Sequence, residues 1–169
     1  AWDKKEGITL CQHSIRDQRF PGMTKDLKAS CQDLATEGFD NQVSYAVVHS
    51  GKWILYEHKV GDPRFPGWKK EFGPGTYDCG THFPNDRLSA VQNLEKDKTP
   101  WEAPKDGVIL SEHGMGDKRF PGKTFHVEKS CENLVALKFN DKISHVTVKS
   151  GEWRFFEHAK ADGRFPGKL

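Results

Sequence analysis

Short hydrophobic segments alternate with turn residues along the whole chain, and this pattern predicts an all-β protein. The stretch Phe139–His158 joins a polar, oxygen-rich turn to an alternating strand, a tight Ser-Gly turn and a second strand. Within it, Val146–Phe156 has the alternation and the central turn of a β-hairpin. One hundred residues earlier, Phe39–His58 has the same arrangement, with Trp53 in the position of Trp153. We therefore interpret the chain as a repeat protein.

The tetrapeptide Arg-Phe-Pro-Gly gives the period of the repeat, because it occurs four times at spacings of 45, 55 and 45 residues. The copies are Arg19–Gly22, Arg64–Gly67, Arg119–Gly122 and Arg164–Gly167. Four histidines, His13, His58, His113 and His158, repeat the same spacings. Two units of about 45 residues therefore form a pair, a linker follows, and the pair begins again.

We expect two domains, residues 1–92 and 107–169, joined by a charged linker at residues 93–106 with Pro100 and Pro104. Short strands separated by turn residues every 8 to 12 positions are typical of a β-sandwich. In the fourth unit we expect a strand at WRFFEHAK, but counterparts of Trp68–Gln92 are missing.

Two smaller features are expected outside the strands. Single helical turns are expected at Asp33–Thr36 and at Glu132–Ala136. Trp2 and Trp101 each stand at the head of a pair, and each is expected to pack onto its own domain.

Composition and charge narrow the class of protein. A hydrophobic content of 35%, with 11 Phe, 5 Trp and 3 Tyr, supports packed cores. The net charge is +2 with both signs interleaved, so the basic stripe of a nucleic-acid-binding surface is absent from the sequence. No apolar run approaches the roughly 20 residues of a membrane-spanning helix. The start at Ala1 fits either a processed mature product or a polypeptide cleaved after expression. We expect secretion, with a cytoplasmic location as the alternative.

The four cysteines are interpreted mainly as structural residues. Cys31 and Cys131 occupy the same repeat position and Cys79 lies close to it, which favours small buried hydrophobic side chains over a series of disulfides. Cys11 is an addition to the pattern. If a bridge forms, we expect it between Cys11 and either Cys31 or Cys79.

Three clusters of oxygen-bearing side chains recur at matching places before strands. They are Asp40, Asn41 and Ser44, then Asn85, Asp86 and Ser89, then Asn140, Asp141 and Ser144. Such a density of oxygen suits Ca²⁺, which prefers six to eight oxygen ligands. The alternative is a set of Asx-turns without metal, because Asn, Asp and Ser also bond their own backbone in turns.

Other repeated residues are interpreted structurally. Each of the four histidines ends a first strand in a different unit, which favours a strand-end role over a shared metal site. In Arg-Phe-Pro-Gly, Phe can pack on the sheet, Pro fixes φ and Gly supplies a positive φ. The exposed arginines of these turns could alternatively serve a partner. The chain has no Gly-x-Ser-x-Gly, His-Glu-x-x-His or phosphate-loop motif, and we expect no enzymatic activity.

Taken together, the ordered motifs resemble those of the βγ-crystallin superfamily, especially its calcium-binding microbial and invertebrate members. The motifs are the Cys-x-x-Leu loop, the Asn/Asp-Asn/Asp-x-x-Ser turn, the Ser-Gly-x-Trp link and the run FGPGTY. The resemblance covers Gly7–Gln92 as a double Greek key and Gly107–Leu169 as an incomplete one. It implies a β-sandwich of two Greek keys per domain, with two calcium ions held in a double clamp.

The resemblance also implies the calcium ligands. Side chains are expected from Asp40, Asn41, Ser44, Asn85, Asp86 and Ser89, and backbone carbonyls from Gln42, Arg87 and residues near Gln12 and Glu57. In the second domain the matching loop is Asn140, Asp141, Lys142 and Ser144. With one carboxylate per loop and a cation at Arg87 and Lys142, we expect a Kd of roughly 10⁻⁵ to 10⁻³ M.

The resulting expectation is a calcium-binding protein with a structural or stress-protective role. The alternative is a secreted interaction module on the same scaffold, with an adhesion, toxin-like or proteinase-inhibitor role. Because Greek keys exchange strands, the incomplete fourth unit predicts either a strand-exchanged homodimer or further domains of a longer chain.

Overall fold

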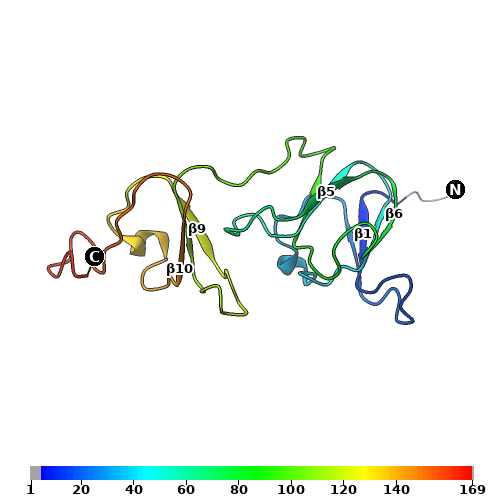
Figure 1. The fold of residues 1–169 in the computed structure, drawn as a ribbon. Helices are drawn as coiled ribbons and strands as arrows, with labels where there is room; N and C mark the ends of the chain where they lie inside the picture. The colour runs from blue at the N-terminus through cyan, green and yellow to red at the C-terminus, as the bar shows by residue number, and fades with distance from the viewer. Residues whose placement is uncertain (1–4, 169) are drawn as a thin grey trace. The chain divides into compact units, whose positions relative to one another are not determined.

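The computed structural model describes residues 5–168, which divide between two units. Unit 1 comprises Ala1–Val60 and Arg64–Glu102, and unit 2 comprises Gly61–Pro63 and Ala103–Leu169. The strands of unit 1 are β1 (Ile8–Cys11), β2 (Thr24–Leu27), β3 (Tyr45–Val48), β4 (Trp53–Tyr56), β5 (Lys69–Phe72), β6 (Gly75–Asp78) and β7 (Ala90–Asn93). Those of unit 2 are β8 (Val108–Ser111), β9 (Thr124–Val127) and β10 (His145–Val148). Figure 1 follows the chain through these elements, and the all-β prediction is confirmed.

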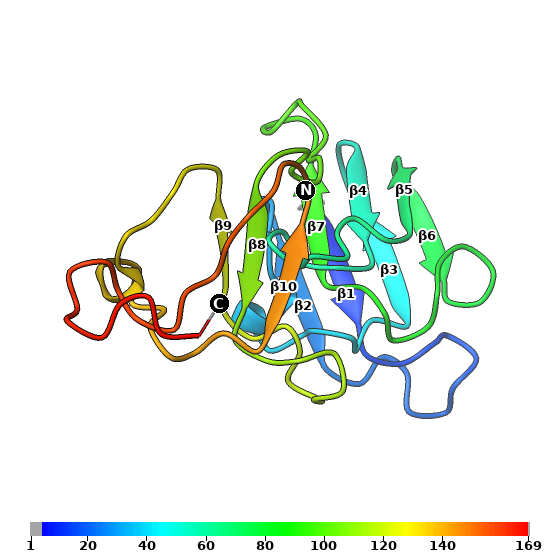
Figure 2. The ribbon, with the colours of Figure 1, turned by 60° about the vertical axis from the view of Figure 1, so that its left-hand side comes forward.

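Unit 1 is a sandwich of two antiparallel sheets that share strands between the two Greek keys. One sheet has the order β2-β1-β3-β6 and the other has the order β5-β4-β7. Strand β6 follows β5 in sequence but pairs with β3 in the first sheet, with Ala46 opposite Tyr77 (Figure 2). In the opposite direction, the backbone of Cys31 in the first key forms an isolated β-bridge with Val91 of β7, which belongs to the second sheet. This exchange confirms the double Greek key of the first domain.

The Ser50-Gly51 link joins two sheets and does not form a hairpin, which corrects the hairpin interpretation. β3 and β4 flank Ser50-Gly51 but lie in different sheets. Gly51 adopts a φ of +78°, and the indole of Trp53 donates to the Ser50 carbonyl oxygen at 3.0 Å. Because Trp53 is fully buried, the link turns the next strand across the core.

Unit 2 repeats this link but not the strand after it. β8 lies between β9 and β10 in a three-stranded sheet (Figure 2). The indole of Trp153 again donates to a serine carbonyl, at 2.9 Å from Ser150 O. However, residues 153–156 form no strand, so the predicted strand WRFFEHAK is wrong. The described part of unit 2 holds no counterparts of β5 and β7, the strands that flank β4 in unit 1.

The two units bury their repeated side chains to different extents. Leu55 and Tyr56 of β4 are 1% and 0% exposed, whereas the corresponding Phe155 and Phe156 are each 43% exposed. Burying a large apolar side chain contributes about 1.5 to 3 kcal/mol, so most of the core energy lies in unit 1.

The predicted helical turns and Arg-Phe-Pro-Gly turns are confirmed. Helix η1 (Leu34–Glu37) begins after Asp33, whose side chain accepts from Ala35 N, and η2 (Leu134–Leu137) begins in the same way after Asn133. The Phe20 ring packs edge-on against Tyr45 with centroids 5.1 Å apart, and Gly22 has a φ of +68°.

Trp101 packs in unit 1, so the prediction that it packs onto the second domain is wrong. Its ring stacks on Tyr56 with centroids 5.4 Å apart, and its indole donates to Asp97. Its backbone N–H donates to Gln92 Oε1, which also accepts from the Tyr56 hydroxyl. Trp101, which lies within the expected linker, is thereby fixed to β4 and β7. The expectation for Trp2 lies outside the described residues.

The cysteines differ in burial. Cys11 and Cys79 are buried, Cys31 is half-buried and Cys131 is exposed, and all four are free thiols. The prediction that Cys131 is buried is therefore wrong. Cys31 is covered because its backbone forms a β-bridge with Val91 of β7. The described part of unit 2 has no strand equivalent to β7 that could cover Cys131. No helix among the described residues is long and apolar enough to cross a membrane.

Candidate metal centre

Three loops with the same backbone geometry present the predicted oxygen clusters. The second residue of each loop has a positive φ, at 52° for Asn41, 51° for Asp86 and 55° for Asp141. Asn and Asp tolerate this left-handed conformation better than other side chains. The sequence places them where the chain must turn sharply into a strand.

The two loops of unit 1 are held against each other by buried residues and backbone hydrogen bonds. Val43 and Leu88, the fourth residues of the two loops, are both fully buried. The Asn41 N–H donates to Leu88 O at 3.0 Å, and the Asp86 N–H donates to Val43 O at 3.2 Å. This reciprocal pairing brings together loops that belong to different Greek keys.

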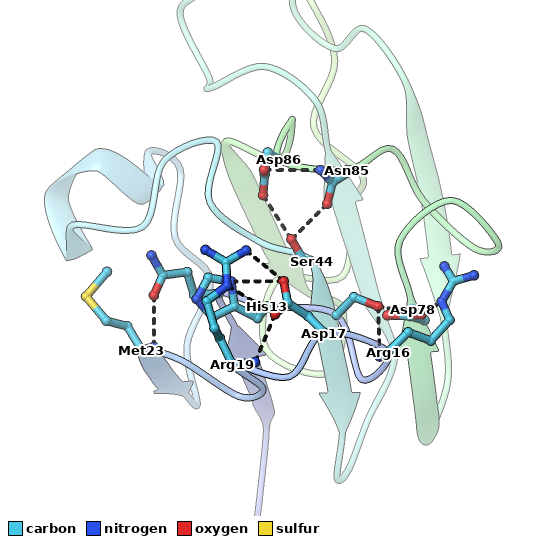
Figure 3. A network of polar contacts seen from close by, with 11 residues as sticks. His13, Arg16, Asp17, Arg19, Met23, Ser44, Asp78, Asn85 and Asp86 are labelled. Atoms are coloured by element: carbon cyan, nitrogen blue, oxygen red, sulfur yellow. Dashed lines mark hydrogen bonds and ion pairs between the residues drawn. The ribbon is translucent and has the colours of Figure 1, made fainter.

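The serine of the first loop lies among the oxygens of the second loop. Ser44 is only 5% exposed, and its Oγ lies 2.8 Å from Asn85 Oδ1 and 2.9 Å from Asp86 Oδ1 (Figure 3). The Asn85 amide donates instead to the other carboxylate oxygen of Asp86, at 3.1 Å. Three oxygens therefore converge, and the serine hydroxyl supplies the one proton shared among them.

The reciprocal site joins the serine of the second loop to the first loop. Ser89 is 7% exposed, and its Oγ lies 3.4 Å from Asn41 Oδ1. The Asn41 amide donates to Asp40 at 3.2 Å, as the Asn85 amide does to Asp86. The structure thus groups the predicted side chains into two crossed sets, each with oxygen-bearing side chains from both Greek keys.

The predicted loop of unit 2 is more open. The Asn140 amide donates to Asp141 Oδ2 at 2.7 Å, but Ser144 is exposed, unlike Ser44 and Ser89. Lys142 is exposed as well. The described part of unit 2 contains one such loop, so its oxygens face no second set.

The remaining predicted residues lie at the edges of these sites. Gln12 accepts from Met23 N through its side chain at 3.1 Å, and Glu57 accepts from Trp68 N at 3.0 Å. Their side chains therefore hold the Arg-Phe-Pro-Gly loops closed. A metal-ligating role for the nearby backbone carbonyls, as for those of Gln42 and Arg87, remains a prediction.

A cavity of about 440 Å³ opens beside Ser44 and adds residues that sequence reasoning missed. We call it the Ser44 cavity. Its lining consists of Gln12, His13, Ser14, Arg16, Asp17, Arg19, Asn41, Gln42, Ser44, Cys79, Asn85 and Asp86. The loop that precedes Arg-Phe-Pro-Gly thus faces the oxygen cluster (Figure 3).

An arginine fork fixes the charge of Asp17 in this loop. Arg19 donates through Nε to Asp17 Oδ1 at 3.1 Å and through Nη2 to Oδ2 at 2.8 Å. These side-chain hydrogen bonds, with a backbone bond from Arg19, hold the pKa of Asp17 well below its usual range. The recurrence of Asp two residues before each Arg-Phe-Pro-Gly was the signal that could have identified it.

The donor set fits a hard divalent cation. Ca²⁺ is bound by carboxylate, amide, hydroxyl and backbone oxygens, and unit 1 brings the first three together in each crossed set. The described residues contain no group of three or more His, Cys, Asp and Glu side chains that could hold a metal ion. The oxygens that do converge are donors of the kind that suits calcium better than zinc, which prefers nitrogen and sulfur.

Comparison with known proteins identifies the family. The model of the Beta/Gamma crystallin family matches residues 16–94 and 116–165, and the chain therefore belongs to this family. Human β-crystallin B1 is 22% identical over 142 residues, which cover 83% of this chain and 52% of that protein. Chicken β-crystallin B2 is 24% identical over 158 residues, which cover 85% of this chain and 68% of that protein.

A solved βγ-crystallin from Ciona intestinalis is also similar, at 30% sequence identity and a TM-score of 0.44. The match covers 51% of this chain and 96% of that one. The chain spans between about half and two thirds of the length of the curated relatives that it matches. These relatives are named as crystallins and not as enzymes.

Proposed function

We propose that unit 1 binds calcium in its two crossed sites and that the ions stabilise a structural or stress-protective protein. The observation that carries this proposal is the convergence of Ser44, Asn85 and Asp86 from two Greek keys. An ion there would be held by the oxygens of these three side chains, with the serine hydroxyl still protonated and its proton turned away from the ion. The Asp40, Asn41 and Ser89 set forms the second site.

The physical consequence is that each ion links the two keys. Ser44 and Asn85 are 41 positions apart in sequence, so the complete ligand set exists only when both keys are folded. A ligand that binds only the folded state stabilises it by RT ln(1 + [L]/Kd), which is about 2.7 kcal/mol at 100 times Kd. Calcium therefore acts on the stability of unit 1 through the contact between its Greek keys.

Thermal unfolding in calcium and in chelator tests the proposal. In 10 mM calcium we expect Tm to rise by about 10 °C over the value in chelator, from the usual relation between free energy and Tm in a domain of this size. The same concentration of magnesium is the control, because Mg²⁺ demands a smaller octahedral shell and should raise Tm less. Superimposable curves in calcium and chelator would exclude calcium binding.

A second candidate function, an interaction module, is favoured by the apolar surface of unit 2. Phe155, Phe156 and Phe165 are 43%, 43% and 39% exposed, and their counterparts in unit 1 are buried. Exposed apolar groups of this kind often mark contact with another polypeptide. The partner proposed is a second copy of the chain or further domains of a longer chain. Light scattering of the purified chain distinguishes a dimer from a monomer.

A further inference from the structure

The loop beside the Ser44 cavity departs from the repeat at two positions. His13, Asp17 and Arg19 recur in the other three loops, whereas Arg16 stands where those loops have Gly61, Gly116 and Ala161. Ser14 likewise stands where they have Lys59, Gly114 and Ala159. The residues that recur maintain the common turn. Arg16 and Ser14 are therefore not needed for the turn itself.

Both added side chains bind the same carboxylate. Ser14 Oγ donates to Asp78 Oδ2 at 2.9 Å, and Arg16 Nε donates to the same oxygen at 3.1 Å. Arg16 Nη2 also donates to the Cys79 carbonyl at 3.2 Å (Figure 3 shows Arg16 beside Asp78). The carboxyl of Asp78 is 13% exposed, while the Arg16 side chain is 70% exposed. Asp78 thus anchors a guanidinium at the mouth of the cavity.

A second guanidinium lines the same cavity. Arg19 is held by Asp17 through Nε and Nη2, and its side chain is 72% exposed. Arg16 and Arg19 each keep an Nη1 group that donates to no described residue. An arginine fork that is already oriented loses little freedom when its remaining N–H groups bind an oxyanion.

The charge around the cavity depends on calcium. Arg16 and Arg19 line the cavity together with the carboxylates of Asp17 and Asp86, and Asp78, which pairs with Arg16, adds a third carboxylate. The formal charge of this group is −1, and one bound Ca²⁺ changes it to +1. An anion is therefore repelled before calcium binds and attracted afterwards, over distances at which charges in a partly enclosed site still interact.

We propose that the Ser44 cavity is a calcium-dependent site for an oxyanion, a carboxylate or a sulfate carried by a small acidic molecule. Arg16 holds the oxyanion at the mouth of the cavity, and Arg19 adds a second positive charge to the cavity lining. A volume of about 440 Å³ accommodates a molecule of the size of a monosaccharide. This inference rests on the proposed calcium binding, and it adds a ligand class that the calcium site alone does not specify.

The test uses the full chain and two probes, glucuronate for a carboxylate and methyl sulfate for a sulfate. Calcium is titrated first without a probe, and each probe is then titrated into calcium-loaded protein and into protein in chelator by calorimetry. We expect binding of at least one probe in calcium, weakened about 10-fold or more in chelator, within the usual range of coupling between sites. Methyl glucoside, which has no charge, is the control ligand.

Variants separate a specific site from general attraction. Arg16→Gln is expected to weaken the probe about fivefold or more while tightening calcium without a probe, because one cation is removed in both cases. Arg16→Lys keeps the charge and should have a smaller effect. Arg119→Gln, which removes the fork to Asp117 in unit 2, should leave probe binding unchanged.

Three results would overturn the inference. They are no binding of either probe to calcium-loaded protein, equal binding in chelator, and equal binding by Arg16→Gln. If calcium binds and the probes do not, only this inference fails and the proposed function stands. If calcium itself gives no heat and no Tm change, both fail.

Discussion

Ser44 Oγ in the first Greek key lies 2.8 Å from Asn85 Oδ1 in the second key. The backbone bonds from Asn41 to Leu88 and from Asp86 to Val43 hold the two loops in this position. The polar cluster is thus built by the packing of two repeats, and its oxygens meet because the buried fourth residues of the loops pack into one core.

Removing one loop carboxylate should lower calcium affinity more in unit 1 than in unit 2. Asp86→Ala removes the charged ligand of a complete crossed set, and we expect calcium affinity in unit 1 to fall about 10-fold, since affinity follows ligand charge. Asp141→Ala changes an isolated exposed loop and should have a smaller effect. Isothermal titration of the two variants makes the comparison, and equal losses would contradict the assignment of the sites.

Equivalent residues of the two units should differ in their contribution to stability. Leu55→Ala removes a side chain that is 1% exposed and should cost about 2 to 5 kcal/mol. Phe155→Ala changes a side chain that is 43% exposed and should cost less than about 1 kcal/mol. Urea unfolding followed by tryptophan fluorescence measures both.

The same pair of variants also tests whether unit 2 is covered in solution. If Phe155→Ala proves as costly as Leu55→Ala, the aromatic surface of unit 2 is covered by another polypeptide. Light scattering should then show a dimer that this variant weakens.

The arginine forks should make stability fall in acid. Hydrogen bonds from Arg19, Arg119 and Arg164 hold the pKa values of Asp17, Asp117 and Asp162 well below the usual 3.8. A carboxyl with a lowered folded-state pKa stabilises the fold above its unfolded pKa, and this contribution is lost as pH falls from about 4 towards the folded-state pKa.

We therefore expect Tm in metal-free buffer to decline below about pH 4, with a smaller decline in Asp17→Asn. The control is Asp106→Asn, which changes an exposed aspartate for which the described residues provide no guanidinium partner. If the wild type and Asp17→Asn decline equally, the fork does not contribute to the stability of the fold.

The four thiols should react at different rates. Burial raises the pKa of the Cys11 and Cys79 thiols, with nearby Asp26 and Asp78 adding to the increase, so both should react slowly in the native protein. Cys131 is exposed and should react first. Mass spectrometry after brief treatment with a thiol reagent identifies the modified cysteine. Preferential labelling of Cys11 would show that β1 and β3 are less well packed than in the structure.

Much of the fold and most of the candidate site could be predicted from local sequence. The loops at Asp40, Asn85 and Asn140 carry Asn or Asp where a positive φ is required, and Arg-Phe-Pro-Gly carries Gly at a similar position. Such requirements act within a few residues, so the type of residue reveals them directly. The period of the repeat then shows that the two keys of unit 1 carry the same motifs in the same order.

The tertiary structure alone decided which elements meet. Apolar and polar residues alternate on both sides of Ser50-Gly51 in the same way whether the turn forms a hairpin or links two sheets. Only the pairing of β3 and β4 with strands of different sheets distinguishes the two cases. Trp101 packs on Tyr56 because its backbone N–H can donate to the Tyr56 hydroxyl on β4 and to the Gln92 side-chain oxygen on β7.

Residue types and turn conformations were thus determined by the sequence, because they depend on near neighbours. The position of Arg16 over the Ser44 cavity, the crossing of Ser44 and Ser89 between loops, and the exposure of Phe155 depend on contacts between residues far apart in the chain. Those contacts follow from how whole sheets pack, which a local pattern does not encode.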